Sequence, residues 1–162
     1  MTSARRPARS SPKADPIAEA VRYLARGDRS AAQVQRYLAG RGFSKAEIRR
    51  ALRTLQRLGY VDDEAVALRM AEARLARRPM AREALAVELE ARGFAPAAVA
   101  RAVQRAYAGL SEEAVAQRFL KSLPRRFTDP SREGRRRAGL LRGRGFSADV
   151  SESVLGVMAN HS

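Results

Sequence analysis

A six-residue motif occurs three times in the chain at nearly equal spacing. The copies are Leu38-Ala-Gly-Arg41-Gly42-Phe43, Leu89-Glu-Ala-Arg92-Gly93-Phe94 and Leu141-Arg-Gly-Arg144-Gly145-Phe146. The glycine of the Arg-Gly-Phe triplet recurs after 51 residues and then after 52. A period of this size is typical of a tandem array of one small structural unit, so the motif constrains the whole fold.

The motif itself has the features of a helix end that is followed at once by a new helix. We expect a helix to end at the arginine, the glycine to adopt a left-handed backbone, and the phenylalanine to turn inward behind that cap. Ser44 and Glu47 then have the spacing of a capping box, and Pro96 stands where a first-turn proline is tolerated. Ser147 is the matching cap in the third copy.

Apolar residues recur at helical spacing after each motif. They are Ile48, Leu52, Leu55 and Leu58, then Val99 and Val103, then Val150, Val154, Val157 and Met158. Upstream of each motif there is room for two more helices, and no alternating run is long enough for a strand. The sequence therefore predicts an all-α fold of three tandem, helix-turn-helix-like repeats in an elongated array. The expected divisions are a disordered basic tail at 1–14 and repeats at 15–60, 61–109 and 110–162.

The third repeat departs from the pattern at one core position. Val34 and Leu85 each lie eight residues before their motif glycine, but Arg137 occupies that place in the third copy. Either its helix is rotated or shortened, or its core is thinner.

The chain carries a strong and uneven positive charge. It has 32 Lys and Arg against 17 Asp and Glu, a net charge of +15. Residues 121–144 hold nine basic residues against only Asp129 and Glu133. Such a field attracts polyanions, either nucleic acid or a protein complex that contains it. The alternative is a solvated face in an arginine-rich chain.

Helical geometry gathers eight of the arginines into two ridges. At about 100° per residue, one side of a helix collects Arg49, Arg50, Arg53 and Arg57, and another collects Arg132, Arg135, Arg136 and Arg142. Guanidinium groups without interleaved acids suit phosphate or carboxylate surfaces. Aromatic residues are few, so a surface that contacts a nucleic-acid backbone or a protein partner is favoured over one that reads bases.

Residues that carry catalysis or bind metals are scarce. The chain has no cysteine, and its one histidine, His161, stands near an end that we expect to fray. We find no nucleophile–base pair, metal-ligand set or nucleotide-binding glycine motif, so we expect no catalytic, cofactor or metal site. The acidic cluster at 62–64 is typical of a helix start rather than a metal site, and Tyr60 is expected to be packed.

Targeting segments are likewise missing from the sequence. No apolar stretch reaches membrane-spanning length, and Met1–Lys13 lacks the apolar segment of a secretory signal. We therefore expect a cytoplasmic protein that has no contact with membranes. We also expect it to be a monomer.

Several segments, taken in order, resemble the bacterial regulatory protein RecX family. They are Tyr23-Leu24 through Arg29-Ser30, Leu38 to Phe43, Leu58-Gly-Tyr-Val-Asp-Asp-Glu64, and Leu141 to Ser147. The resemblance covers about residues 16–158. It departs at Val66, where family members usually have phenylalanine.

The resemblance implies a modulator of the RecA recombinase built from three tandem three-helix units. Such proteins bind in the groove of the RecA filament on single-stranded DNA, block its extension and promote its disassembly. Strand exchange, ATP hydrolysis and co-protease activity then fall, which affects DNA repair and the SOS response. The expected partners are the RecA filament and single-stranded DNA, contacted directly or through the filament, and no enzymatic activity is implied.

Two other functions stay open at this point. The first is a helix-turn-helix-type DNA-binding transcription regulator, although no helix shows a clear set of Asn, Gln and Arg for reading bases. The second is a helical protein associated with RNA or the ribosome. Dependence on RecA would separate these functions from the implied one.

Overall fold

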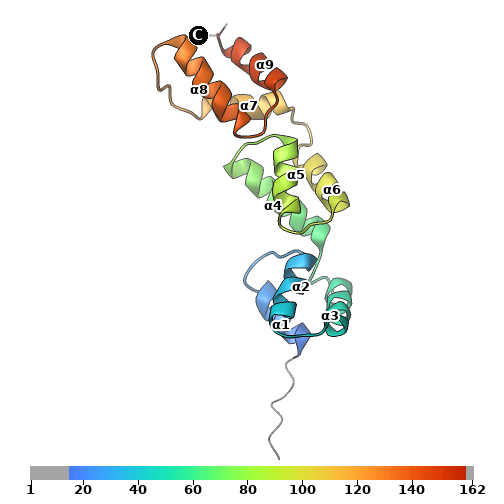
Figure 1. Ribbon diagram of the computed structural model, residues 1–162. Coiled ribbons are helices and arrows are strands. Elements are labelled where there is room, and N and C mark those ends of the chain that lie inside the picture. The colour runs from blue at the N-terminus through green and yellow to red at the C-terminus, as the bar shows by residue number, and fades with distance from the viewer. Residues whose placement is uncertain (1–14, 160–162) are drawn as a thin grey trace, which may run out of the picture. The chain divides into compact units, whose positions relative to one another are not determined.

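The computed structural model describes residues 15–159, and these form nine helices without any strand (Figure 1). The all-α prediction is thereby confirmed. The predicted basic tail over 1–14 and His161 lie outside the described residues. The chain divides into two compact units: one runs to Arg29 and resumes over Gln33–Val61, and the other holds Ser30–Ala32 and the residues from Asp62 onward. The boundaries of the three repeats stay predictions.

The first unit is a three-helix group made of α1 (Pro16–Leu24), α2 (Ala31–Gly40) from Gln33 onward, and α3 (Lys45–Arg57). Asp15 caps α1 by accepting the N–H of Ile17 at 3.0 Å. The predicted capping box at the start of α3 is confirmed, since Ser44 and Glu47 satisfy each other's backbone N–H groups. One stripe of each helix faces inward, and its buried residues are Ala20, Val34, Leu38, Ile48, Ala51 and Leu55, joined by Val61.

Aromatic and charged side chains join α1 to α2 in this unit. The rings of Tyr23 and Tyr37 are stacked, with centroids 4.2 Å apart. The Tyr37 hydroxyl donates to Glu19 at 3.2 Å and accepts from Arg41 at 3.0 Å. The arginine of the first motif therefore holds α1 against the end of α2.

The second unit contains the other six helices. They are α4 (Asp63–Arg77), α5 (Arg82–Glu90), α6 (Pro96–Ala106), α7 (Glu112–Lys121), α8 (Pro130–Arg142) and α9 (Ala148–Ala159). Asp62, Ser111 and Asp129 cap α4, α7 and α8 through their side chains. Ser147 accepts the N–H of Val150 at 3.2 Å, as predicted for the third repeat.

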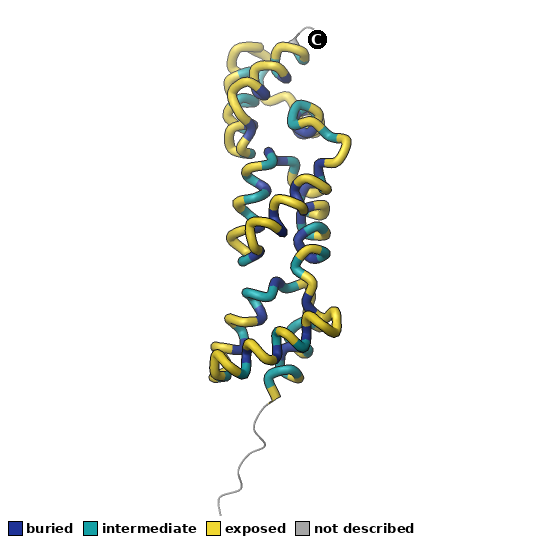
Figure 2. Tube along the Cα trace, turned by 90° about the vertical axis from the view of Figure 1, so that its right-hand side faces the viewer, coloured by how far each residue is buried: buried dark blue, intermediate teal, exposed yellow. Residues whose placement is uncertain are grey.

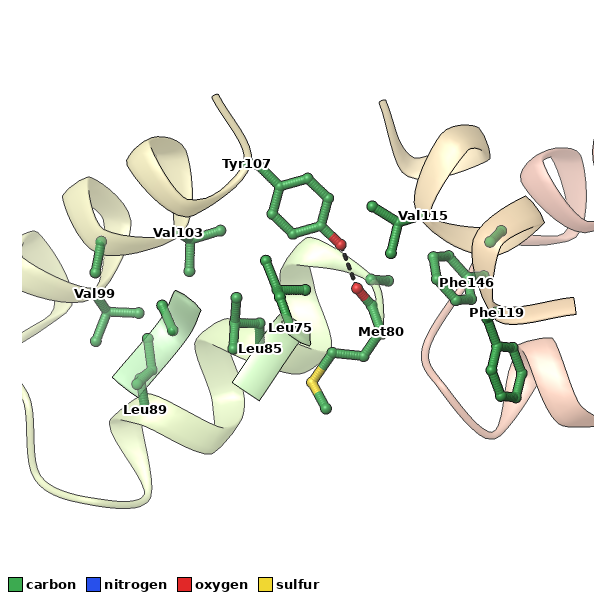
Figure 3. Packing of buried hydrophobic residues seen from close by; sticks show 14 of the residues in the cluster. Leu75, Met80, Leu85, Leu89, Val99, Val103, Tyr107, Val115, Phe119 and Phe146 are labelled. Carbon is green, nitrogen blue, oxygen red and sulfur yellow. Dashed lines mark hydrogen bonds between the residues drawn. The ribbon is translucent and has the colours of Figure 1, made fainter. Parts of the chain in front are cut away.

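A continuous apolar core runs through the second unit from α4 to α9 (Figure 3). Helices α4 and α5 with the turn between them contribute Leu75, Met80, Leu85 and Leu89; α6 with its C-cap residue contributes Val99, Val103 and Tyr107; α7 contributes Val115 and Phe119. Phe94 and Phe146, the last residues of the second and third motifs, are both buried. Buried positions alternate with exposed ones along the helices, as amphipathic patterns require (Figure 2).

The three motifs share one backbone conformation. Gly42, Gly93 and Gly145 have φ angles of 86°, 88° and 80°. The N–H of Phe43 bonds to the carbonyl of Leu38 at 3.3 Å, and that of Phe146 bonds to Leu141 at 3.2 Å, as in a Schellman cap. The helices end one or two residues before the arginine, earlier than predicted, because the last turn tightens into three-residue hydrogen bonds.

The third motif docks onto the turn between α4 and α5. Ala81 donates its N–H to the carbonyl of Arg144 at 2.9 Å, and the Arg144 guanidinium donates to the carbonyl of Pro79 at 3.1 Å. A Cβ added at Gly145 would lie 2.7 Å from the Cβ of Ala84. A side chain is therefore excluded at this glycine by space as well as by backbone angle.

The start of α7 closes the same junction. Glu112 accepts the N–H of Arg82 at 2.7 Å, which caps α5 from a neighbouring helix. Within the second unit the equivalent positions repeat this pattern, since Asp63 accepts the N–H of Ala31 at 2.8 Å and the Ser30 hydroxyl donates to the carbonyl of Arg92 at 2.9 Å. The motif arginine thus supplies a carbonyl to the residue that precedes a helix in both places.

Some residues expected to be packed are exposed. Leu58 and Tyr60 are 59% and 55% exposed, because they lie on the turn after α3 rather than on its inward stripe. Val157 in α9 is 44% exposed. Phe43 is only half-buried, unlike Phe94 and Phe146.

Candidate functional site

The outer face of α3 presents four arginines to solvent. Arg49, Arg50, Arg53 and Arg57 are all exposed, opposite the buried residues Ile48, Ala51 and Leu55. Among the described residues, none of these four guanidiniums takes part in an ion pair or a side-chain hydrogen bond. The structure thus places these residues together on one surface of the first unit, which we call the α3 ridge.

One carboxylate stands near the start of the α3 ridge. Glu47 lies in the first turn of α3, where its carboxylate accepts the N–H and the hydroxyl of Ser44 at 2.9 and 2.8 Å. That carboxylate is therefore engaged in capping the helix. The guanidiniums of the ridge remain available to an external anion.

The predicted ridge on α8 is only partly of this kind. Arg132, Arg135 and Arg142 are exposed, but Arg136 lies with its guanidinium 2.9 Å from the carboxylate of Glu133. The expectation that this ridge has no neighbouring acid is wrong for Arg136. Glu133 precedes Arg136 by three residues, a spacing that places both side chains on the same side of the helix.

Glu133 is the centre of a buried polar cluster. Its carboxylate is also 2.9 Å from Arg137, and it accepts the backbone N–H groups of Arg126 and Phe127 at 3.2 Å each. The hydrogen bond from Arg137 lowers the pKa of Glu133 to about 2; burial opposes this shift, whereas the two backbone donors and the charge of Arg136 support it. The carboxylate is therefore ionised at neutral pH, as a group with four charged or backbone donors should be.

This cluster explains the unusual residue of the third repeat. Arg137 takes the position held by Val34 and Leu85 in the other copies, and it contacts Glu133 and the sulfur of Met158 instead of an apolar core. The helix is not shortened, since α8 spans 13 residues. A buried ion pair of this kind adds little to stability compared with apolar packing, but its geometry is specific.

Two arginines of this region were not among the sequence-predicted contacts. Arg125 and Arg126 are exposed on the segment between α7 and α8, beside Phe127, whose ring is covered by the guanidinium of Arg132 at 4.7 Å. The sequence signal in this region is the helical spacing of Glu133, Arg136 and Arg137. That pattern could predict the ion pairs, but not the backbone groups that reach Glu133 from a loop.

The arginines of the repeat motifs serve the fold. Arg144 lies over the ring of Phe119 at 4.4 Å while it bonds to Pro79. Arg41 contacts Tyr37 and lies 3.7 Å from Glu19. These contacts agree with the structural role expected for the motif.

Across residues 15–159, no three His, Cys, Asp or Glu side chains gather closely enough to hold a metal ion. None of the helices in that range combines the length and the apolar character needed to cross a membrane.

Comparison with known proteins identifies the family. The family model for the first three-helix domain of RecX matches residues 18–58. Regulatory protein RecX of Mycobacterium marinum is 31% identical over 154 residues, which are 92% of this chain and 88% of that protein. Regulatory protein RecX of Treponema pallidum is 34% identical over 111 residues, 68% of each chain.

Solved structures show the same fold. The crystal structure of RecX from Lactobacillus salivarius superposes with a TM-score of 0.78 at 15% identity, covering 89% of this chain and 94% of that one. A second crystal structure of a regulatory protein RecX gives a TM-score of 0.66 at 17% identity, covering 86% and 71%. The relatives are named as regulatory proteins rather than enzymes. On these similarities, the chain belongs to the RecX family of regulatory proteins.

Proposed function

We propose that the chain modulates the RecA recombinase. It binds RecA filaments on single-stranded DNA, blocks their extension and promotes their disassembly, and so lowers strand exchange, ATP hydrolysis and co-protease activity in DNA repair and the SOS response. The observation that carries this proposal is the 31% identity to a regulatory protein RecX over 92% of this chain.

The α3 ridge supports the proposal physically. A filament of RecA on DNA offers both phosphates and protein carboxylates, and guanidinium groups bind either in bidentate fashion. Arg49, Arg53 and Arg57 are exposed and hold no carboxylate of their own among the described residues. Such a surface can gain ion pairs on binding without first breaking any.

The proposed mode of action is binding rather than catalysis. The relatives are named for regulation, and no group of described His, Cys, Asp or Glu side chains could hold a metal ion. We infer that a monomer acts in the cytoplasm, where RecA filaments form. The partners are then the RecA filament and the single-stranded DNA within it.

A helix-turn-helix transcription regulator is the second candidate. The short turn over residues 41–44 between α2 and α3 favours it, because DNA-binding helix pairs are joined in this way. The exposed face of α3, however, carries mostly arginines, which contact phosphates in any sequence.

The two functions are separated by the dependence of binding on RecA. Immobilised single-stranded DNA with and without cognate RecA, and duplex DNA alone, are exposed to the chain at physiological salt. The proposal predicts much tighter retention when the RecA filament is present. Equal retention without RecA, or tight binding to one duplex sequence, would contradict the proposal and favour the regulator.

Charge reversal on the α3 ridge tests this surface in the same retention experiment. Replacing Arg49, Arg53 and Arg57 together by Glu should weaken retention by the filament, while the helical circular dichroism signal stays unchanged because all three side chains are exposed. A variant with Arg26→Glu, Arg36→Glu and Arg105→Glu changes the same number of exposed arginines elsewhere and serves as the control.

A further inference from the structure

The segment between α7 and α8, residues 123–129, is held in place by Glu133; we call it the α7–α8 loop. Glu133 accepts the backbone N–H groups of Arg126 and Phe127 at 3.2 Å each. Arg136 bridges the same carboxylate at 2.9 Å and the carbonyl of Pro124 at 3.5 Å. A buried side chain, 4% exposed, thus fixes the backbone of a loop that carries two adjacent arginines.

The two arginine side chains of this loop point to solvent, whereas Leu123 packs against the core. Arg125 and Arg126 are exposed, and together with Phe127 and Thr128 they line an open hollow of about 370 Å³. Arg132, from the first turn of α8, lies over the Phe127 ring at 4.7 Å. Among the described residues, the guanidiniums of Arg125, Arg126 and Arg132 have no carboxylate partner.

Both acids of the region are already engaged. Asp129 accepts the N–H of Arg132 at 2.8 Å and so caps α8. The N-terminus of α8 is therefore already occupied by a carboxylate of the protein itself. Glu133 is taken up by Arg136, Arg137 and the loop backbone. An external anion would therefore meet side-chain guanidiniums rather than the helix end.

We propose that the α7–α8 loop binds the phosphate backbone of single-stranded DNA directly, without RecA, through Arg125, Arg126 and Arg132. Glu133 is the positioning residue that holds these arginines around the hollow. The choice of single-stranded DNA as the polyanion rests on the proposed function. The direct contact, its location and its independence from RecA go beyond it.

The lining of the hollow favours a nucleic-acid chain over an acidic peptide. Arginine clusters also bind acidic peptides, but most peptide-binding sites add apolar pockets or a sheet edge, and here the only apolar lining residue is Phe127. Several guanidiniums around an open hollow suit the repeated phosphates of a polynucleotide instead.

The test is the salt dependence of binding to fluorescent oligo(dT), measured by anisotropy with the full chain and no RecA. Arg125→Ala with Arg126→Ala is compared with Arg36→Ala plus Arg105→Ala, which removes the same charge from exposed positions elsewhere. The loop variant should lower the slope of log affinity against log salt by about 0.7 for each lost contact, and lower affinity by about tenfold. The control should keep the slope of the parent.

Three outcomes decide the matter. Equal slopes and affinities for the loop variant and the control would overturn the inference. A loop variant that binds oligo(dT) normally but no longer binds RecA filaments would overturn it too, and would assign the loop to an acidic protein surface. A chain that binds oligo(dT) through the loop but leaves RecA activity unchanged would support the inference and contradict only the proposed function.

The positioning role of Glu133 and a simple effect of net charge predict opposite changes in the affinity for oligo(dT). Glu133→Gln makes the chain more positive, so charge alone predicts tighter binding to oligo(dT). If Glu133 positions the loop, binding weakens instead, and Glu133→Asp restores part of it. Tighter or unchanged binding by Glu133→Gln, with an unchanged helical signal, would overturn the positioning role.

Discussion

The hydroxyl of Tyr107, at the end of α6, donates a hydrogen bond to the main-chain carbonyl of Met80, just before α5 (Figure 3). Both residues are buried, with 1% and 2% of their surface exposed. The guanidinium of Arg82 lies over the Tyr107 ring at 4.2 Å and also donates to the carbonyl of Leu110 at 3.1 Å. One side chain therefore ties the end of α6 to the turn on which the third motif docks.

Replacing Tyr107 by Phe should lower the free energy of unfolding by about 1–3 kcal/mol. The ring still fills its place, but the buried carbonyl of Met80 loses its partner. Urea denaturation followed by circular dichroism measures the loss. Tyr60→Phe is the matched control, since Tyr60 is 55% exposed, and its stability should stay within about 0.5 kcal/mol of the parent.

Alkaline pH should reveal the contribution of Tyr107 to the stability of the fold. Burial, together with the negative charge of Glu112, raises the pKa of Tyr107 to about 12, from 10.0 for the free side chain. The folded chain then keeps a proton that the unfolded chain releases, so the contribution of Tyr107 is fully present below pH 10 and is lost as the pH rises toward 12. Thermal melts across this range should show a shallower decline for Tyr107→Phe than for the parent; parallel declines would contradict the assignment.

Acid pH should act on the third repeat through Glu133. Its folded-state pKa of about 2 lies below the ordinary 4.5, so its contribution to stability is present above pH 4.5 and is lost as the pH falls toward 2. Glu133→Gln should be less stable than the parent at pH 7, and the two melting temperatures should converge in that acid range. A constant difference between them would show that the carboxylate charge is not what stabilises the loop.

The sequence predicted the backbone of the motifs because the relevant forces are local. A glycine after a helix, a following phenylalanine and a capping serine act within a few residues. The positive φ angles of Gly42, Gly93 and Gly145 confirm the predicted left-handed glycines. The partners of Arg41 and Arg144 could not be predicted in the same way. Their contacts with Glu19 and Pro79 depend on packing between segments far apart in the chain.

Alanine substitutions at Gly42, Gly145 and Gly139 should differ in their effect on stability. Gly42→Ala should cost about 1–2 kcal/mol, the penalty of a left-handed residue with a Cβ. Gly145→Ala should cost about 1–3 kcal/mol more, because its Cβ would lie 2.7 Å from that of Ala84. Gly139→Ala, inside α8 with open space around it, should be neutral or stabilising by up to about 1 kcal/mol. Equal melting temperatures for the Gly42 and Gly145 variants would refute the close approach.

The arginine surfaces show the same division between local and distant causes. Helical spacing placed Arg49, Arg50, Arg53 and Arg57 together on α3, and all four are exposed as expected. It could not show that the loop before α8 folds back onto Glu133, which also engages Arg136. Charge density along the sequence locates a basic region, but the pairing within it depends on tertiary contacts.

The rate of single-stranded-DNA-dependent ATP hydrolysis by cognate RecA, measured against rising concentrations of the chain, tests the central claim most directly. The account predicts that hydrolysis falls at chain concentrations at or below that of RecA. It also predicts that the Arg49, Arg53 and Arg57 charge reversal inhibits less than the control that reverses Arg26, Arg36 and Arg105. Unchanged hydrolysis at low salt, with a chain whose circular dichroism shows folded helices, would contradict the account.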